Sequence, residues 1–218
     1  IVDSSILKIA LEYTKTFGGR VISFCQDEFL AKKGVLNESI VSTELGLKGI
    51  PNISESINMY RDIEILRYSG GKIHIPYVTT SKGVDLIREA KKNNLDITAS
   101  VSLAHITFSE KDIPEFDTNY KLIPPLRSES DLNSLKEGLV DGTLDYLTSM
   151  HEPFDIDNKK IVFDNASSGS IGLESMFGLM SNQFTLEKTI DILTRKKIIF
   201  GVDDHPIEIG SLADLSLF

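Results

Sequence analysis

The feature that most constrains this chain is a series of four short apolar segments that alternate with helical patterns. The predicted strands are residues 20–25, 72–78, 96–102 and 144–150. The predicted helices are residues 4–17, a segment of about a dozen residues capped by Ser54, and residues 83–92, 131–139, 171–179 and 185–194. Strands that alternate with helices imply a parallel sheet with right-handed crossovers. The sequence therefore predicts an α/β fold.

Four such units make half of a (β/α)8 barrel of the TIM type. Most of the predicted strands are apolar on both faces, as parallel strands covered on both sides should be. Half a barrel cannot close, and it leaves two open sheet edges. The first helical pattern begins almost at Ile1, without an initiator methionine. We therefore expect the second half of a barrel whose first half precedes residue 1; an open sheet is the alternative.

Two stretches depart from the repeat. Residues 26–54 contain several glycines and a proline and are predicted to form a long loop, which in a compact domain is usually functional or packed over a site. From residue 196 the pattern changes to three short β segments separated by turn residues. The predicted organisation is a barrel half over residues 1–195 and part of a small β subdomain over residues 196–218.

Charge and composition exclude several classes of protein. The 218 residues carry a formal net charge of −9, which argues against nucleic acid as a partner because phosphate binding requires a basic surface. With Cys25 as the single cysteine, neither a disulfide framework nor a cysteine-rich zinc site can form within the chain. No apolar run approaches the length that crosses a membrane. We expect a cytoplasmic protein without membrane association.

The last predicted strand ends in an unexpected residue. The sequence from Asp141 to Phe154 is an acidic turn, an apolar run and then a loop that opens at Met150. In α/β barrels the catalytic groups stand at the carboxyl ends of the strands. A thioether does not titrate and is only a weak acceptor, so Met150 cannot serve there as a general base.

Seven segments, in order along nearly the whole chain, resemble the dihydroorotases, which are cyclic amidohydrolases of the metal-dependent hydrolase superfamily. The segments are residues 34–65, 72–80, 96–105, 121–127, 141–153, 165–174 and 207–218. The residues that shape the family's backbone are present: Gly49, Pro51, Pro124, Pro125, Gly142, Gly169 and Gly172. The resemblance implies a barrel fold and a link to pyrimidine biosynthesis, in which the family reversibly closes carbamoyl aspartate to dihydroorotate.

The resemblance also implies zinc chemistry, with one or two Zn²⁺ ions that activate a water and an aspartate on the eighth strand as general base. It places family histidine ligands at Phe24 and Tyr77 and the aspartate at Met150. Phe24 and Met150 offer no hard ligand, and Tyr77 could bind only as a phenolate, whose ordinary pKa is near 10. No catalytic residue and no metal ligand is therefore predicted in this chain. Zinc is expected only if the family's H-x-H pair survives in the missing amino-terminal half.

The substrate side is altered as well. The resemblance assigns substrate binding to Ile123, Phe154, Ser168 and Gly169, and two of these depart from the family. Ile123 replaces an asparagine and Phe154 replaces a histidine. Polar groups left unused in a cavity would each cost about 1–3 kcal/mol if unsatisfied, so apolar replacements favour folding once catalysis is lost.

The histidines raise the question of a relocated metal site. The chain contains His74, His105, His151 and His205, none of them at H-x-H or H-x-x-x-H spacing. His105 and His151 each follow a predicted strand and could approach one another. Satisfied structural or surface histidines are the commoner outcome.

Several other residues have both a functional and a structural interpretation. Asp27 and Glu28 could face the barrel mouth, although solvated loop acids are commoner. Arg127 could contact an anionic ligand or form a structural ion pair. Cys25 has no base predicted beside it, so a buried strand residue is expected. Lys159 and Lys160 are most simply interpreted as a solvated pair in a loop.

Three functions remain open. The first is a non-catalytic dihydroorotase-like protein, a pseudoenzyme that acts as a structural or regulatory subunit. The resemblance implies aspartate carbamoyltransferase as its partner, or a homo-oligomer. The second is an active zinc-dependent dihydroorotase, or a related cyclic amidase, with an altered site. The third is a module that senses a pyrimidine precursor without turning it over.

Overall fold

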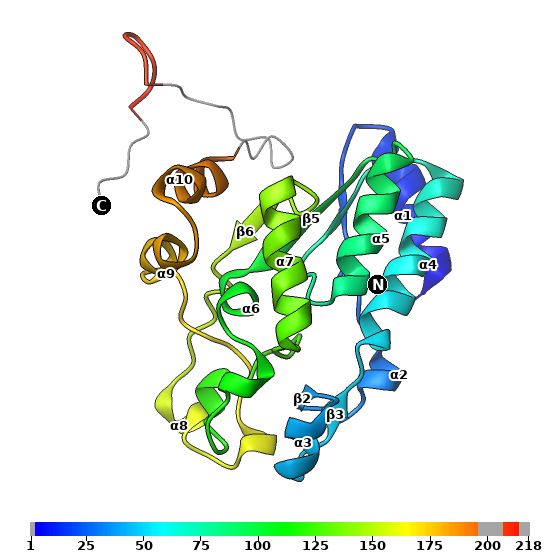
Figure 1. Ribbon diagram of the computed structural model, residues 1–218. Coiled ribbons are helices and arrows are strands. Elements are labelled where there is room, and N and C mark those ends of the chain that lie inside the picture. Colours follow the sequence, from blue (N-terminus) through cyan, green and yellow to red (C-terminus); the bar gives the residue numbers. More distant parts are fainter. Residues whose placement is uncertain (1–2, 196–206, 214–218) are drawn as a thin grey trace.

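The computed structural model describes residues 3–195 and 207–213. Its centre is a parallel sheet in the order β1–β4–β5–β6 (Figure 1). The strands are Val21–Ile22, Ile73–Ile75, Ile97–Ser102 and Tyr146–Thr148. All four lie within the segments predicted from the sequence, and every neighbouring pair is parallel. The predicted α/β fold, with a parallel sheet that corresponds to part of a barrel, is confirmed.

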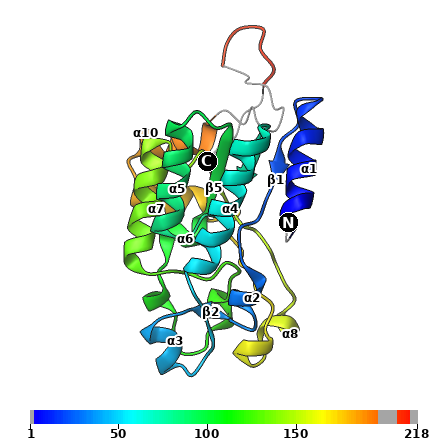
Figure 2. The same ribbon diagram turned by 90° about the vertical axis from the view of Figure 1, so that its right-hand side faces the viewer.

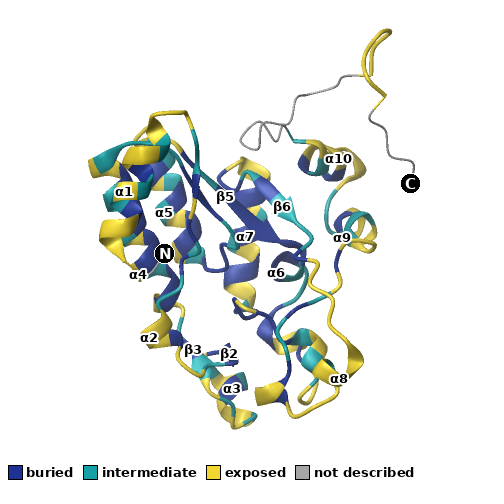
Figure 3. Ribbon diagram, turned by 180° about the vertical axis from the view of Figure 1, so that it is seen from behind, coloured by how far each residue is buried: buried dark blue, intermediate teal, exposed yellow. Residues whose placement is uncertain are grey.

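The strand register sorts the side chains of the sheet onto two faces. Val21, Ile73 and Ile97 lie side by side and are all buried, whereas Ile22 and His74 point the other way. Ile22 is 58% exposed. The first face is therefore closed by helices, and the second face is open at its β1 edge. The view from behind shows buried strands framed by the more exposed outer turns of the helices (Figure 3).

The helices cover the closed face and bury one continuous core with it (Figures 1 and 2). The main helices are α1 (Ser4–Lys15), α4 (Ile53–Ser69), α5 (Ser81–Lys92), α7 (Glu129–Asp141), α9 (Met176–Gln183) and α10 (Leu186–Thr194). Polar side chains cap the first turns of α5 and α7: Thr80 accepts from the Gly83 amide before α5, and Ser128 accepts from the Asp131 amide before α7. These caps fix where each crossover helix starts relative to the strand before it. The predicted cap at Ser54 is wrong, because α4 begins at Ile53 and has no side-chain cap.

The predicted long loop over residues 26–54 is wrong in detail. It contains α2 (Glu28–Ala31), β2 (Leu36–Asn37), α3 (Ile40–Glu44) and β3 (Gly49–Ile50), and β2 pairs with β3 in parallel. Side chains of this segment pack against a second apolar cluster that includes Leu122, Leu126 and Phe163. The segment therefore forms a small layer at the end of the sheet. Its elements are too short to give a clear periodic pattern.

Further short elements were not predicted: α6 (Leu103–Thr107), α8 (Ile156–Lys159) and the 3₁₀ turns Glu110–Asp112, Thr118–Tyr120 and Phe163–Asn165. The predicted helix at residues 171–179 is displaced, because α9 begins at Met176. The reason lies at Gly172, where a Cβ would stand 2.3 Å from the Ser149 carbonyl oxygen. The chain is therefore held in extended contact with the loop after β6 before the helix can start.

The carboxyl-terminal β segments fall largely outside the described residues. Residues 207–213, which the structure describes, form turns and no strand. The remaining parts of those predicted segments, residues 196–206 and 214–218, are not described. Within the described residues, no helix is both long enough and apolar enough to cross a membrane.

Candidate functional site

The three positions singled out by the sequence lie at the carboxyl ends of the strands, here called the strand-end edge of the sheet. Phe24 follows β1, Tyr77 follows β4 and Met150 follows β6. Since the strands are parallel, their carboxyl ends meet at the same edge. Met150 is 4% exposed, and the other two side chains are half-buried. This edge is where an α/β barrel carries its active site.

The backbone at this edge is unusual. Tyr77 has a φ of 55° and Met150 a φ of 48°, both in the left-handed region. Non-glycine residues seldom adopt this conformation, and they do so mostly as asparagine or aspartate. Such strained residues cluster at active sites, where surrounding structure holds them in place. The backbone at these strand ends therefore has the strained conformation that is common at functional sites. The side chains there are buried or half-buried.

These side chains do not fit a zinc ion. Burial raises the pKa of Tyr77, and the nearby Glu152 carboxylate raises it further, so its phenolate is even less accessible than in water. Phe24 has no ligand atom, and Met150 offers only a thioether. Among residues 3–195 and 207–213, no group of three or more histidine, cysteine, aspartate or glutamate side chains is placed to hold a metal ion.

Two of the remaining histidines are structural. The ring of His74 makes contacts of 2.9 Å and 3.2 Å with the hydroxyls of Thr98 and Ser100. The ring of His105 lies 2.6 Å from the Ser102 hydroxyl and 3.0 Å from the Pro124 carbonyl oxygen. Burial lowers the pKa of each imidazole to about 4, so both are neutral near pH 7.

The other two histidines do not complete a metal site with them. His151 is exposed, and its Nδ1 accepts a 3.4 Å hydrogen bond from the Leu173 amide. Both ring nitrogens of His105 already have partners within the barrel half, so a shared site with His151 would have to break one of them. His205 lies outside the described residues.

The family's substrate positions are spread over two loops. Ile123 is 43% exposed and Phe154 is 46% exposed, whereas Gly169 is buried and Ser168 is half-buried. Gly169 has a φ of 157°, and a Cβ there would lie 2.6 Å from the Glu152 carbonyl oxygen. Only glycine allows the two loops to approach this closely. The two chain segments are joined further by the 2.8 Å hydrogen bond from the Glu152 amide to the Ser170 carbonyl oxygen.

A cavity of about 350 Å³ opens between these loops and α6. Its walls include Phe154 and Gly169, but not Phe24, Tyr77, Met150, Ile123 or Ser168. The cavity is therefore offset from the point where the strand ends meet. Its volume lies within the range of small-molecule sites.

Of the two acidic residues that follow β1, Asp27 has a structural role. The Asp27 carboxylate caps α2 by accepting hydrogen bonds from the Phe29 and Leu30 amides, at 3.0 Å and 2.9 Å. Glu28 is exposed in the first turn of the same helix. Cys25 is buried, and burial raises the pKa of its thiol, with the Asp62 carboxylate adding to the effect. The thiol is therefore not activated as a nucleophile.

Arg127 is also structural. It is 3% exposed, and its guanidinium donates to the side chains of Asn37 and Asn52 and to the Ile50 carbonyl oxygen, at 2.8 Å, 3.0 Å and 2.8 Å. A fourth hydrogen bond, of 3.2 Å, reaches the Thr79 hydroxyl. Arg127 thus ties the small β2–β3 layer to the end of β4 and does not point to a ligand.

The prediction that residues 159–160 form a solvated pair is wrong for Lys159. Its ammonium donates to the carbonyl oxygens of Thr118, Ser167 and Gly169, at 2.9 Å, 3.0 Å and 2.8 Å. Lys160 is exposed, as predicted. Nothing in the sequence separates these neighbours, because only the folding of the loops brings the three carbonyl oxygens to Lys159.

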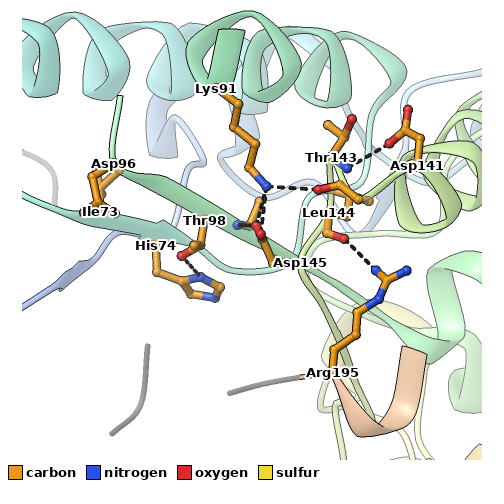
Figure 4. Close-up of polar contacts among 12 residues, drawn as sticks. Ile73, His74, Lys91, Asp96, Thr98, Asp141, Thr143, Leu144, Asp145 and Arg195 are labelled. Atoms are coloured by element: carbon orange, nitrogen blue, oxygen red, sulfur yellow. Dashed lines mark hydrogen bonds and ion pairs between the residues drawn. The ribbon is translucent and has the colours of Figure 1, made fainter. Parts of the chain in front are cut away.

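At the opposite edge of the sheet, polar residues also have structural partners (Figure 4). Lys91 forms a 2.8 Å ion pair with Asp145, whose carboxylate accepts a 2.8 Å hydrogen bond from the Ala99 amide. Arg20 pairs with Asp96 at 2.7 Å. These groups join the amino ends of neighbouring strands, which in α/β barrels is the face concerned with stability.

Comparisons with known proteins agree with this geometry. No family model matches the chain. A dihydroorotase of Caldanaerobacter subterraneus subsp. tengcongensis is 36% identical over 224 residues, which cover 99% of this chain and 51% of that protein. A dihydroorotase of Syntrophus aciditrophicus is 38% identical over 179 residues, which cover 82% of this chain and 42% of that protein. The chain spans about half the length of the curated relatives it matches.

Solved structures share the fold. L-hydantoinase (dihydropyrimidinase) from Arthrobacter aurescens superimposes with a TM-score of 0.81 at 19% identity, over 97% of this chain and 50% of that one. Dihydroorotase from Saccharomyces cerevisiae, in complex with 5-fluoroorotic acid, superimposes with a TM-score of 0.71 at 14% identity, over 93% of this chain and 55% of that one. The fold is that of half a TIM-type barrel, the class of fold that these hydantoinase and dihydroorotase structures share. Within that class, the sequence relatives make the chain a homologue of the dihydroorotases, as the resemblance predicted.

Proposed function

We propose that the protein is a dihydroorotase-like component of pyrimidine biosynthesis that does not catalyse ring closure and acts as a structural or regulatory subunit. The observation that carries the proposal is the composition of the sheet edge. Phe24, Tyr77 and Met150 occupy the carboxyl ends of three parallel strands, at the positions where the resemblance expects two histidine ligands and an aspartate.

Zinc-dependent hydrolysis requires a bound metal ion, an activated water and a group that transfers a proton. Phe24 and Met150 can supply none of these functions. Tyr77 could accept a proton only as a phenolate, and the direction of its pKa shift opposes that state. What the three side chains do supply is packing, because Met150 is buried and the other two are half-buried at the open end of the core.

A subunit role follows from what the family assembles with. The resemblance points to aspartate carbamoyltransferase, or to further copies of the same protein, as the partner. Retention of the barrel fold without the catalytic set is the expected state of a chain that is selected for its surface and stability. On this proposal, the surface of the folded barrel carries the function, and the strand ends do not.

The direct test is metal analysis of the purified full-length protein, together with an assay of ring closure from carbamoyl aspartate. We expect substoichiometric zinc and no activity above background. A value near one zinc per chain, with ring-closing activity, would overturn the proposal. Co-purification of the protein with aspartate carbamoyltransferase, measured against a size standard for the free chain, tests the subunit role separately.

A further inference from the structure

The cavity between α6 and the loops after β6 has an aromatic lining. Phe108, Tyr120 and Phe154 form its walls, and the buried side chains of Leu122 and Leu126 form part of its base. The rings of Phe108 and Tyr120 meet edge to face with their centres 5.4 Å apart. Such an arrangement presents aromatic surface to whatever occupies the cavity, and aromatic faces attract apolar groups and cations.

The walls are held in place by Lys159. Its ammonium has three protons, and the three carbonyl oxygens of Thr118, Ser167 and Gly169 accept them. Burial lowers the pKa of this ammonium, and the neighbouring Lys121 adds to that effect. Although Lys159 lines the cavity, its hydrogen-bonding capacity is therefore spent on the loops and not on a ligand.

Glu152 is the other charged residue that lines the cavity. Its amide is fixed by the Ser170 carbonyl oxygen, and its carboxylate influences the hydroxyl of Tyr77. Within residues 3–195 and 207–213, that carboxylate has no hydrogen bond or ion pair.

We propose that this cavity binds a cationic amphipathic small molecule, an ammonium group carried on an aromatic body. The ammonium pairs with the Glu152 carboxylate, and the body lies against Phe108, Tyr120 and Phe154. The net charge of −9 favours the approach of a cation over that of an anion. Carbamoyl aspartate and dihydroorotate carry carboxylates and are disfavoured by the same group. This inference concerns ligand binding and does not depend on whether ring closure has been lost.

The test is a calorimetric or NMR titration of the full-length protein with two probes that share a phenyl ring and differ in charge: 2-phenylethylamine and 3-phenylpropionate. At pH 7 the first is a cation and the second an anion. We expect the amine to bind about tenfold more tightly than the acid. Substitution Glu152→Gln should weaken amine binding about fivefold and so reduce the preference to about twofold, and it should not unfold the protein because Glu152 is exposed.

Two further variants locate the site. Phe154→Ala should weaken binding of both probes, since it removes part of the aromatic wall. Glu137→Gln, at an exposed position on α7, should leave both affinities unchanged. The proposal fails if the acid binds as tightly as the amine, if Glu152→Gln leaves the amine affinity unchanged, or if no amine binds at about 10 mM. Zinc-dependent activity would overturn the proposed function and leave this preference intact, so the two failures are distinguishable.

Discussion

Two regions at the same end of the sheet treat polar residues in opposite ways. At the strand-end edge, Phe24, Tyr77 and Met150 replace the polar residues that the family resemblance expects. Around Thr79, which follows β4 at the same end of the sheet, Glu55 and Arg127 are both buried and both charged, being 2% and 3% exposed. The difference lies in the hydrogen bonds that each position can make.

The buried network is fully engaged. The Glu55 carboxylate accepts hydrogen bonds from the amides of Thr79 and Thr80 and from both of their hydroxyls. Arg127 reaches four acceptors, and the Asp131 carboxylate accepts from the Ser81 amide at 2.8 Å. Burying a charge is tolerable when its partners are supplied by fixed backbone and side-chain groups. Polar residues persist here because they hold the 26–54 segment onto the barrel half.

At the strand-end edge such partners would have to come from a metal or a substrate. Without either, polar groups there would be buried and unsatisfied, which is a cost to folding. Apolar residues remove that cost. The buried charges of Glu55 and Arg127 are therefore structural ties, whereas the side chains of Phe24 and Met150 need no hydrogen-bond partner.

The largest expected effect comes from breaking the network. Arg127→Met should lower the free energy of unfolding by about 3–5 kcal/mol, because it leaves Glu55, Asp131 and Glu110 without their cation. Urea denaturation followed by circular dichroism measures this. Lys111→Met is the matched control: Lys111 pairs with Glu129 at 3.3 Å with both side chains more than two-thirds exposed, and its loss should cost less than about 0.5 kcal/mol. A loss below about 1 kcal/mol for Arg127→Met would contradict the comparison.

The second prediction restores a carboxylate to the strand-end edge. Met150→Asp should lower the free energy of unfolding by about 3 kcal/mol at pH 7.5, because Met150 is 4% exposed and a carboxylate buried there would lose its hydration. Burial should raise the pKa of the new carboxyl above its unfolded value, so the loss should shrink as pH falls through that raised pKa. Denaturation at pH 7.5 and pH 5 tests this, with Met150→Leu as a control that costs less than about 1.5 kcal/mol. A neutral Met150→Asp would mean that the edge still accommodates a polar group.

The third prediction uses pH. Burial lowers the pKa of His105 to about 4 in the folded protein, below its value in the unfolded chain. The neutral imidazole therefore costs no stability above the unfolded-state pKa, and the free energy of unfolding decreases as pH falls from that pKa toward the folded-state pKa. By pH 4.5 this histidine should cost about 2 kcal/mol, and His74 acts in the same direction. Replacement His105→Gln should flatten the decline in unfolding free energy between pH 7 and pH 4.5. His151→Gln, at an exposed position, should leave the decline unchanged; equal slopes for His105→Gln and the unaltered protein would count against a buried neutral imidazole.

The smallest expected effect distinguishes two adjacent lysines. Lys159→Met should lower the free energy of unfolding by about 1 kcal/mol and speed proteolysis within residues 155–170, because three carbonyl oxygens lose their donor. Lys160→Met should change neither quantity, since Lys160 is exposed. Limited proteolysis of the two variants side by side provides the measurement. Equal cleavage rates would show that the loops are not held by Lys159.

Much of the barrel half could be predicted because its signals are local. Apolar runs long enough to be recognised predicted the four strands, and the helical pattern of residues 83–92 predicted α5. The small layer over residues 26–54 could not be predicted, because its strands are only two residues long and are held by Arg127 from far along the chain.

The sequence by itself determined the alternation of strands and helices, the kinship with the dihydroorotases, and the residue types at Phe24 and Met150, which offer no hard metal ligand. Those properties depend on residue type and on spacing along the chain. Only the tertiary structure decided that Arg127 is a structural tie, that Lys159 and Lys160 differ, and that Glu152 lines an aromatic cavity. Burial and hydrogen-bond partners come from segments that are distant in sequence, and a single chain written out in order does not contain those contacts.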